Sequence, residues 1–315
     1  MNLDGRVAIV TGAGRGLGRE HALLLAAKGA TVVVNDRGGS TDGEGADTSI
    51  AQAVVDEISD RRGRAIANGD SVADWSSAKR MIESTVETFG RLDILVNNAG
   101  ILRDRMLVNM SEDEFDVVIN VHVKGTFCPT RHAAEYWRER SKAGDAIDAA
   151  IVNTSSGAGL FNNVGQANYG PAKSAIATFS QIAAKELARY GVRVNTIAPM
   201  ARTRLVSQTP GLGDLSASKG GGFDPWSPEN ISPLVVYLAS PGCPFTGGIW
   251  HVFGGRIDLV KDRSLASSIQ HPGMWTVEAL EVEMKQFMAQ SDCKNGPLVS
   301  ESMSLEQVIS ELVPG

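Results

Sequence analysis

Residues 11–18 constrain the fold of this chain more than any other stretch, because they place four glycines between a short apolar run and a helical pattern. Residues 6–10 form that apolar run, which is typical of a buried parallel strand. Residues 19–28 have helical composition, and residues 31–35 predict a second strand that ends at Asp36. Strand, glycine turn, helix, strand and acid, in this order, predict a dinucleotide-binding βαβ unit.

The turn and the acid each have a physical role in such a unit. Glycines let the backbone approach a pyrophosphate, and the helix N-terminus offers free N–H groups and a positive dipole end. A carboxylate such as Asp36 accepts hydrogen bonds from a ribose diol and repels a 2′-phosphate, so NAD is the expected cofactor. Arg37 follows at once and leaves a minor NADP activity open. The residues expected to bind the cofactor here are Gly12, Arg15, Gly16, Leu17, Gly18 and Asp36.

The rest of the chain continues the alternation of strands and helices. Further strands are predicted at 65–68, 92–96, 149–153, 192–197 and 247–252. Helices are predicted at 50–62, 75–89, 111–140, 166–190, 231–238 and 277–288. This order predicts the α/β class: a single Rossmann-like, doubly wound parallel sheet with helices on both faces.

The glycine-rich and irregular segments set the predicted boundaries. Residues 1–255 are expected to form one domain that includes the active site, and residues 256–315 a C-terminal extension packed on that domain or on a dimer partner. Residues 37–49, rich in glycine, serine and acid, predict an exposed loop. Residues 204–228 are a candidate substrate lid, with an ordinary surface loop as the alternative.

Composition argues against several functional classes. The 315 residues are 43% hydrophobic and 21% charged, enough apolar material for a sizeable core. A net charge of -6 without a long basic run argues against nucleic-acid binding. No stretch reaches the roughly 18 apolar residues of a membrane span. Cys128, Cys243 and Cys293 are far apart, which predicts neither a metal site nor a disulfide framework.

The two ends of the sequence carry no address that we can identify. Residues 1–6 lack the charged and apolar pattern of a signal peptide, and residues 313–315 are not the peroxisomal tripeptide S-K-L. The expected location is therefore the cytoplasm.

Tyr169 and Lys173 are the first candidates for catalysis. Four residues apart in a predicted helix, they lie on one face, which places an ammonium beside a phenol. A phenol holds its proton until pH about 10, and a nearby cation lowers that pKa. The pair therefore predicts a proton-transfer device near neutral pH. The same spacing also occurs by chance on solvated helices, so the surrounding motifs decide its meaning.

Ser156 follows the predicted strand 149–153 and lies 13 residues before Tyr169. Its hydroxyl is suited to hydrogen-bond a substrate oxygen and the tyrosine together, whereas Ser155 is expected to be structural. A hydrolase is disfavoured because no G-x-S-x-G elbow follows a strand; residues 69–73 come closest and lack the last glycine.

The motifs together resemble the short-chain dehydrogenase/reductase family over about residues 5–255. The turn has the form T-G-x-x-x-G-x-G, N-N-A-G follows a predicted strand at residues 97–100, and the Ser–Tyr–Lys spacing matches. The resemblance implies catalytic roles for Ser156, Tyr169 and Lys173. It implies cofactor contacts by Ser71, Val72, Asn98, Tyr169, Lys173 and Thr203.

One position departs from the family pattern. The family carries a catalytic asparagine three residues before a glycine on the helix predicted at 111–140. That glycine matches Gly125, so the asparagine position is His122, while Asn120 points to another face of the helix. Histidine is able to hold the relay water that the asparagine holds, so we expect His122 to take part in proton relay; a packing role is the alternative.

A narrower resemblance concerns the dehydrogenase units of peroxisomal multifunctional enzymes of type 2, also called D-hydroxyacyl-CoA or 17β-hydroxysteroid dehydrogenases. Segments 32–39, 97–105, 165–169 and 199–204 carry it, with His122. It implies NAD-dependent oxidation of a 3-hydroxyacyl-CoA, fatty-acyl or steroid, to the 3-oxoacyl-CoA. Oxidation of a 17β-hydroxysteroid or another secondary alcohol is the alternative, and a non-catalytic NAD-binding protein is a third reading. Relatives pair through the long helices, which implies a homodimer or homotetramer.

Overall fold

The computed structural model describes residues 1–203, 222–261 and 268–290. The chain divides into two compact units, Met1–Val260 and Lys261–Gly315. The described part of the first unit contains one eight-stranded sheet in the order β3-β2-β1-β4-β5-β6-β7-β8. Its strands are β1 (Val7–Thr11), β2 (Thr31–Asn35), β3 (Arg64–Asn68), β4 (Ile94–Asn97), β5 (Ala149–Thr154), β6 (Val192–Met200), β7 (Ile249–Phe253) and β8 (Arg256–Leu259).

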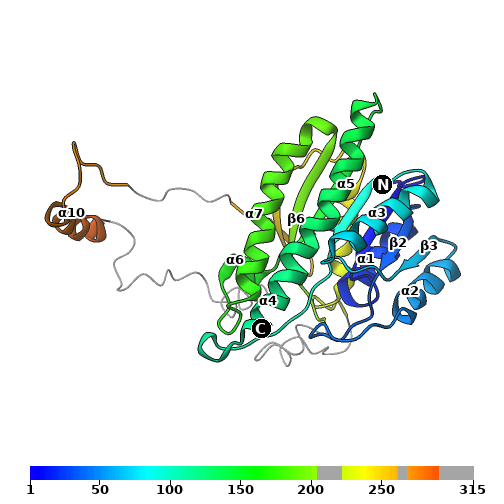
Figure 1. The fold of residues 1–315 in the computed structure, drawn as a ribbon, viewed down its shortest axis with the longest axis horizontal. Helices are drawn as coiled ribbons and strands as arrows, with labels where there is room; N and C mark the ends of the chain where they lie inside the picture. Colours follow the sequence, from blue (N-terminus) through cyan, green and yellow to red (C-terminus); the bar gives the residue numbers. More distant parts are fainter. Residues whose placement is uncertain (204–221, 262–267, 291–315) are drawn as a thin grey trace. The chain divides into compact units, whose positions relative to one another are not determined.

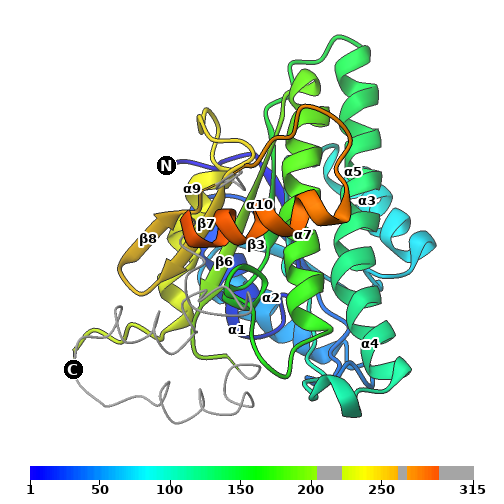
Figure 2. The same ribbon diagram turned by 90° about the vertical axis from the view of Figure 1, so that its left-hand side faces the viewer.

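The first seven strands are parallel, and the order reverses between β1 and β4. Such a switch point opens a crevice at the carboxyl ends of the strands, which is where ligands bind in sheets of this kind. The predicted doubly wound Rossmann-like fold is confirmed, with one addition. β8 pairs with β7 in the antiparallel direction through the turn at Gly254 and Gly255, and Figure 2 shows it at the outer edge of the sheet.

The helices of the first unit cover both faces of this sheet (Figure 1). α1 (Gly16–Ala27), α2 (Ser49–Asp60) and α9 (Ser232–Ala239) pack on one face, whereas α3 (Trp75–Phe89), α5 (Gly125–Lys142) and α7 (Tyr169–Leu187) pack on the other.

Alternate residues of the central strands explain why these strands are apolar throughout. On β1, Ala8 and Val10 belong to the core below α1, α2 and α9, while Ile9 belongs to the core below α3, α5 and α7. Successive side chains of a strand point to opposite faces, so a sheet covered on both sides needs apolar residues at every position. Each fully buried valine or isoleucine of this kind contributes about 1.5–3 kcal/mol.

The helix predicted at 111–140 differs from a regular α-helix. It consists of α4 (Glu112–Ile119), a π-helical turn (Asn120–Lys124) and α5. Ser111 and Glu114 form the predicted capping box. Pro129, inside α5, has no N–H to donate to the carbonyl of Gly125, next to the π turn. The helix is therefore locally irregular where it passes the carboxyl edge of the sheet.

Helix α7 begins at Tyr169 and is capped by Asn168, whose Oδ1 accepts the Tyr169 N–H at 2.7 Å. Pro171 fits because it lies in the first turn. The short helix α6 (Gly157–Phe161) precedes α7 and follows β5 directly. The cap thus fixes the catalytic candidate Tyr169 as the first residue of α7.

In the second unit, the described residues contain α10 (Val277–Gln290), which confirms the helix predicted at 277–288. In the described part of the chain, no helix has the length and apolarity that a membrane span requires. β8 belongs to the first unit, so the sheet extends past residue 255 to Leu259. The packing of the extension stays a prediction.

Candidate active site

A cavity of about 270 Å³ opens at the carboxyl edge of the sheet, beside the switch point between β1 and β4. It is one continuous space that runs from the glycine turn to the start of α7. The predicted site residues that line it are Gly12, Arg15, Gly16, Leu17, Asp36, Ser71, Val72, Asn98, His122, Ser156, Tyr169, Lys173 and Thr203. The structure therefore gathers residues from eight separate segments of the sequence.

Gly18 is the predicted cofactor residue that does not line the cavity. A Cβ atom on Gly18 would lie 2.2 Å from the carbonyl oxygen of Gly12 and 2.5 Å from Nδ2 of Asn98. The residue is glycine because α1 crosses the turn too closely for any side chain. Gly12 has φ 62°, and a Cβ there would lie 2.7 Å from Cα of Ala99.

Asp36 is held in a fixed orientation at the end of β2. Its Oδ2 accepts the backbone N–H of Gly14 at 2.8 Å, and its Oδ1 accepts the N–H of Gly38 at 2.7 Å. A Cβ on Gly14 would lie 2.8 Å from that Oδ2, so glycine is required for this approach. Each carboxylate oxygen keeps a second lone pair that is suited to accept a hydroxyl hydrogen bond.

Thr11 and Asn98 tie the glycine turn to β4. Oγ1 of Thr11 accepts the N–H groups of Asn98 and Ala99 at 3.0 and 3.1 Å. Nδ2 of Asn98 donates back to the carbonyl oxygens of Thr11 and Gly12. The N-N-A-G motif thus fixes the turn from the neighbouring strand, beside the cavity.

The end of β5 supplies both serines, and they point in different directions. Oγ of Ser155 is buried and donates to the carbonyl oxygen of Lys173 at 2.7 Å, the structural role predicted for it. Ser156 lines the cavity and caps α6 by accepting the N–H of Ala158 at 3.2 Å. Of the two, only Ser156 presents its hydroxyl beside Tyr169, with which it hydrogen-bonds.

Lys173 is 3% exposed, and its Nζ donates to the carbonyl oxygen of Thr154 at 2.7 Å. The same Nζ lies 5.5 Å from the ring centroid of Tyr169. Burial lowers the pKa of Lys173 to about 7. The lysine therefore gains and loses a proton near neutral pH, unlike a solvated lysine.

The expected lowering of the Tyr169 pKa by Lys173 is wrong for the protein without a cofactor. Burial raises the pKa of Tyr169 to about 12, the hydrogen bond with Ser156 opposes this rise, and the charge of Asp104 adds to it. Removal from water disfavours the charged phenolate. This effect outweighs the stabilisation of the phenolate by Lys173, because Lys173 is itself easily deprotonated here. Tyr169 therefore holds its proton at neutral pH.

His122 projects from the π turn into the cavity wall and is 1% exposed. Its Nε2 lies 2.8 Å from the carbonyl oxygen and 3.1 Å from the N–H of Ile101. Its Nδ1 is buried and has no hydrogen-bond partner among the described residues. Burial, followed by the charge of Lys173, lowers the pKa of His122 to about 3. The imidazole is neutral, and its ring stands edge-on to Tyr169, 5.1 Å between centroids.

Asn120, the nearest asparagine, is exposed, so the π turn presents His122 to the cavity in its place. A Cβ on Gly100 would lie 2.5 Å from Cε1 of His122, which makes the last glycine of N-N-A-G necessary for this histidine. Sequence reasoning gave Gly100 no role, although its place directly after a strand was the available signal.

The loop after β2 is the larger omission. The loop predicted at 37–49 is largely exposed, as expected, but its part in lining the cavity was not predicted. The residues that line it are Arg37, Gly39, Ser40, Thr41, Gly43 and Gly45. Most of the candidate lid, residues 204–221, lies outside the described residues.

The cavity fits a dinucleotide. Its glycine turn leaves no room for side chains at Gly12 and Gly14, and the oriented carboxylate of Asp36 stands beside it. Gly12, Gly16 and the N-terminus of α1 are placed to hold a pyrophosphate, and Asp36 a ribose diol. Among the described residues, no group of histidine, cysteine and acidic side chains is arranged to hold a metal ion.

A doubly wound sheet with this turn, and with a tyrosine and a lysine across the same cavity, defines a dinucleotide-dependent oxidoreductase. The family model for short chain dehydrogenases matches residues 6–209. The chain belongs to the short-chain dehydrogenase/reductase family, as the motifs predicted.

Individual relatives narrow the comparison. Hydroxyacyl-CoA dehydrogenase ChsB1 of Mycobacterium tuberculosis is 42% identical over 92% of this chain and 91% of its own. Peroxisomal multifunctional enzyme type 2 of Drosophila melanogaster is 38% identical over 100% of this chain, which spans 50% of that enzyme. A short chain dehydrogenase from Mycobacterium avium has a similar crystal structure, with 48% identity, a TM-score of 0.81 and coverage of 92% and 97%.

Proposed function

We propose that this protein is an NAD-dependent dehydrogenase that oxidises a 3-hydroxyacyl-CoA, fatty-acyl or steroid, to the 3-oxoacyl-CoA. The observation that carries the proposal is the single cavity that joins the glycine turn and Asp36 to Ser156, Tyr169 and Lys173. The similarity to a hydroxyacyl-CoA dehydrogenase over 92% of the chain supports the substrate class.

The proposed proton chemistry uses the chain's own groups. Oγ of Ser156 and Oη of Tyr169 hold the substrate hydroxyl between them. Tyr169 first gives its own proton to neutral Lys173, and the resulting phenolate then accepts the hydroxyl proton as the carbonyl forms. NAD⁺ held in this cavity would supply the hydride acceptor and a positive charge on its nicotinamide ring. That charge is what the buried phenol needs, because its pKa is raised to about 12 in the free protein.

The proton then leaves through Lys173 toward His122. Lys173, with its pKa lowered to about 7, exchanges a proton readily at neutral pH. When Nε2–H of His122 donates to the Ile101 carbonyl, the buried Nδ1 carries a lone pair, suited to bind the relay water that an asparagine binds in relatives. The relay role of His122 and the cofactor contacts of Ser71, Val72, Asn98 and Thr203 are parts of this proposal.

The choice of NAD over NADP is supported by Asp36. Two backbone amides hold its carboxylate at the end of β2, where a 2′-phosphate would bring further negative charge. NAD⁺ is therefore the cofactor that we expect to support turnover.

One experiment tests the substrate and the cofactor together. NADH formation is measured with short-chain, long-chain and steroidal 3-hydroxyacyl-CoAs and with free 17β-hydroxysteroids, each with NAD⁺ and NADP⁺. We expect turnover of the thioesters with NAD⁺. Turnover of free steroids alone would select a hydroxysteroid or secondary-alcohol dehydrogenase, and equal kcat/KM with NADP⁺ would refute the Asp36 argument. NAD binding without turnover of any substrate would identify a non-catalytic protein.

We further propose a homodimer or homotetramer located in the cytoplasm, in which residues 256–315 pack on their own domain or on the partner. The exposed side chains of Phe127 on α5 and Ile182 on α7, 42% and 52% exposed, support pairing through these helices. Light scattering coupled to size-exclusion chromatography measures the assembly, and a monomer at micromolar concentration would contradict it.

A further inference from the structure

The loop of residues 37–48, called here the 37–48 loop, follows β2 and runs along the cavity from Asp36 to Ile101. At its start, Gly38 donates its N–H to Asp36, and the N–H of Asp47 donates to the Arg37 carbonyl at 2.7 Å, which closes the loop. Near its tip, a Cβ on Gly43 would lie 3.2 Å from Cδ1 of Ile101. The loop therefore forms one wall of the cavity.

The segment after β4 holds this wall in place. The N–H of Leu102 donates to the carbonyl oxygen of Thr41 at 3.0 Å. Nε of Arg103 donates to the carbonyl oxygen of Asp42 at 3.0 Å, and its Nη2 lies 3.2 Å from Oε1 of Glu44. The guanidinium thus binds two consecutive parts of the loop, one through the backbone and one through a charge.

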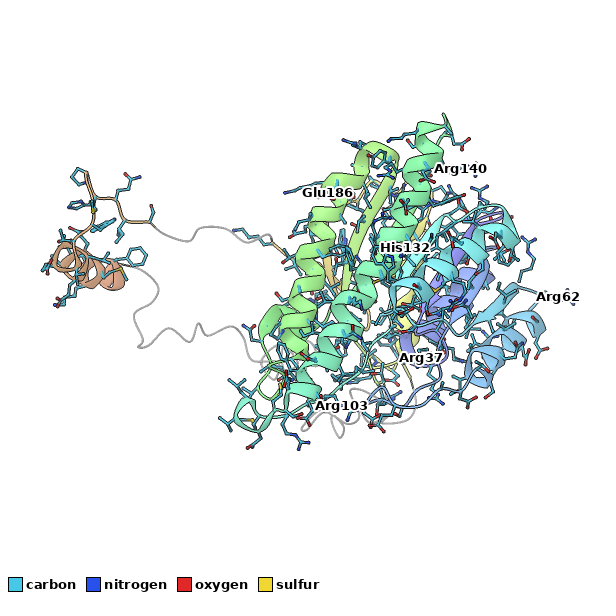
Figure 3. All side chains as sticks on the ribbon, viewed as in Figure 1. Arg37, Arg62, Arg103, His132, Arg140 and Glu186 are labelled. Atoms are coloured by element: carbon cyan, nitrogen blue, oxygen red, sulfur yellow. The ribbon has the colours of Figure 1, made fainter. Side chains whose placement is uncertain are left out.

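Arg103 is itself anchored on its other side. Its carbonyl oxygen accepts Nδ2 of Asn168 at 2.9 Å, and Asn168 caps α7 at Tyr169. Arg105, two residues on, donates its N–H to Gly165 at 2.8 Å. Figure 3 places Arg37 and Arg103 at the same end of the Met1–Val260 unit. We call the contacts of Arg103 with Asp42, Glu44 and Asn168 the clasp. The clasp joins the loop beside Asp36 to the segment that carries Tyr169.

We propose that Arg103 is a positioning residue for the nucleotide: by binding Asp42 and Glu44 it fixes the 37–48 loop as the cavity wall on which cofactor affinity depends. The inference rests on the proposed function in one respect, namely that the cavity holds NAD. A free loop of this glycine content has many conformations, and nucleotide binding would have to order it at a cost in affinity.

The test combines two measurements on the full chain. The Kd of NADH is measured by fluorescence titration, and amide hydrogen exchange at residues 37–48 is measured without nucleotide. Because Arg103→Gln removes one charge-assisted contact and the order of the loop, its Kd is expected to rise about tenfold. Exchange in the 37–48 loop is expected to rise as well. Glu44→Gln keeps the bond to Asp42, so its effect is expected to be smaller.

Arg105→Gln is the matched control. Its side chain binds Glu114 at 3.0 Å and is 55% exposed, so the Kd of NADH and the exchange of the loop are expected to stay at wild-type values. Arg103→Lys keeps the charge but lacks the guanidinium that donates through two nitrogens, so it is expected to give an intermediate Kd. It replaces Arg103→Gln in the test if that variant does not fold.

Two outcomes separate this inference from the proposed function. A Kd for Arg103→Gln within about twofold of wild type, with unchanged exchange in the 37–48 loop, would overturn the role of Arg103. Tighter binding of NADPH than NADH by the wild-type protein would refute the cofactor choice. Exchange in the nucleotide-free protein would still show whether the clasp exists.

Discussion

Two regions of the molecule each hold a buried histidine in a closely similar state. His122 lies in the cavity wall, and His21 lies in the packed contact between α1 and α9. Both histidines are buried, and burial lowers the pKa of each to about 3. Each uses one ring nitrogen in a hydrogen bond: Nδ1 of His21 lies 2.8 Å from Oγ of Ser232, and Nε2 of His122 lies 2.8 Å from the Ile101 carbonyl. The second nitrogen of each has no partner among the described residues.

The surroundings differ, and the difference is instructive. His21 lies between two helices that cover one face of the sheet, whereas His122 lines the cavity beside Tyr169 and feels the charge of Lys173. A buried neutral histidine with one ring nitrogen that has no partner in the described part of the chain is therefore not evidence of function by itself. Its position relative to other titratable groups decides.

Catalysis is where the two histidines should differ most. We expect His122→Leu to lower kcat about 10²-fold, the usual range for loss of a proton-transfer group, because the ring nitrogen that is proposed to bind the relay water is lost. His122→Asn, the residue common in the family, is expected to restore most of the activity. The matched change His21→Leu is expected to leave kcat near wild type. Steady-state kinetics with NAD⁺ measures all three, and equal losses for both leucine variants would break the distinction.

For stability we expect the opposite order: the change at His21 should cost more than the change at His122. His21→Ala opens a space in a packed core and leaves the 2%-exposed Ser232 without its partner, so the free energy of unfolding is expected to fall by about 2–4 kcal/mol. His122→Ala enlarges an existing cavity and is expected to cost less. Urea denaturation measures both, and a larger loss for His122→Ala would reverse the comparison.

Acid should reveal what the two regions share. A histidine with a folded pKa of about 3 is neutral in the folded state but protonated in the unfolded state below pH 6.5. Its contribution to stability is full above pH 6.5 and is lost as the pH falls toward 3. Each histidine is expected to add about 1.4 kcal/mol per pH unit to the slope of the unfolding free energy between pH 6 and 4.

Replacing either histidine with asparagine should remove the same part of this slope. The measurement is urea denaturation of both variants and the wild type across that pH range. A change of slope in one variant alone would mean that the other histidine is already charged in the folded protein.

The sequence could predict those parts of the site that are carried by short, continuous motifs. Gly12 to Gly18, Asp36 and the Ser156–Tyr169–Lys173 spacing each follow a strand or lie in one helix, so local periodicity placed them at the carboxyl edge of the sheet. Ser155 and Asn120 were also assigned correctly, because alternation and helical phase give neighbouring side chains different directions. Oγ of Ser155 bonds to the Lys173 carbonyl, and Asn120 is exposed.

The remaining features depend on contacts between distant segments. The π turn that presents His122 arises where the helix meets Gly100 and Ile101, and the apolar pattern of 111–140 contains no trace of it. The 37–48 loop is largely exposed, as its composition predicts, but its contact with Arg103, some 60 residues later, and its place along the cavity are not encoded in local sequence. The raised pKa of Tyr169 likewise reflects burial, which spacing does not encode.

β8 is a different case, because its signal was present in the sequence. Gly254 and Gly255 separate Ile249–Phe253 from Arg256–Leu259, and a pair of glycines between two strands is a hairpin signal. Placing the domain boundary at residue 255 obscured it.

The most direct test of the account is the effect of Tyr169→Phe on NADH formation from a 3-hydroxyacyl-CoA. The substitution removes the one oxygen that is proposed to accept the substrate proton and keeps the ring that packs against His122 and below Lys173. We expect kcat/KM to fall by at least about 10³-fold while the thermal midpoint stays near wild type. A variant that retains a tenth or more of wild-type kcat/KM would contradict the proposed mechanism. A tenfold loss corresponds to only about 1.4 kcal/mol of transition-state stabilisation.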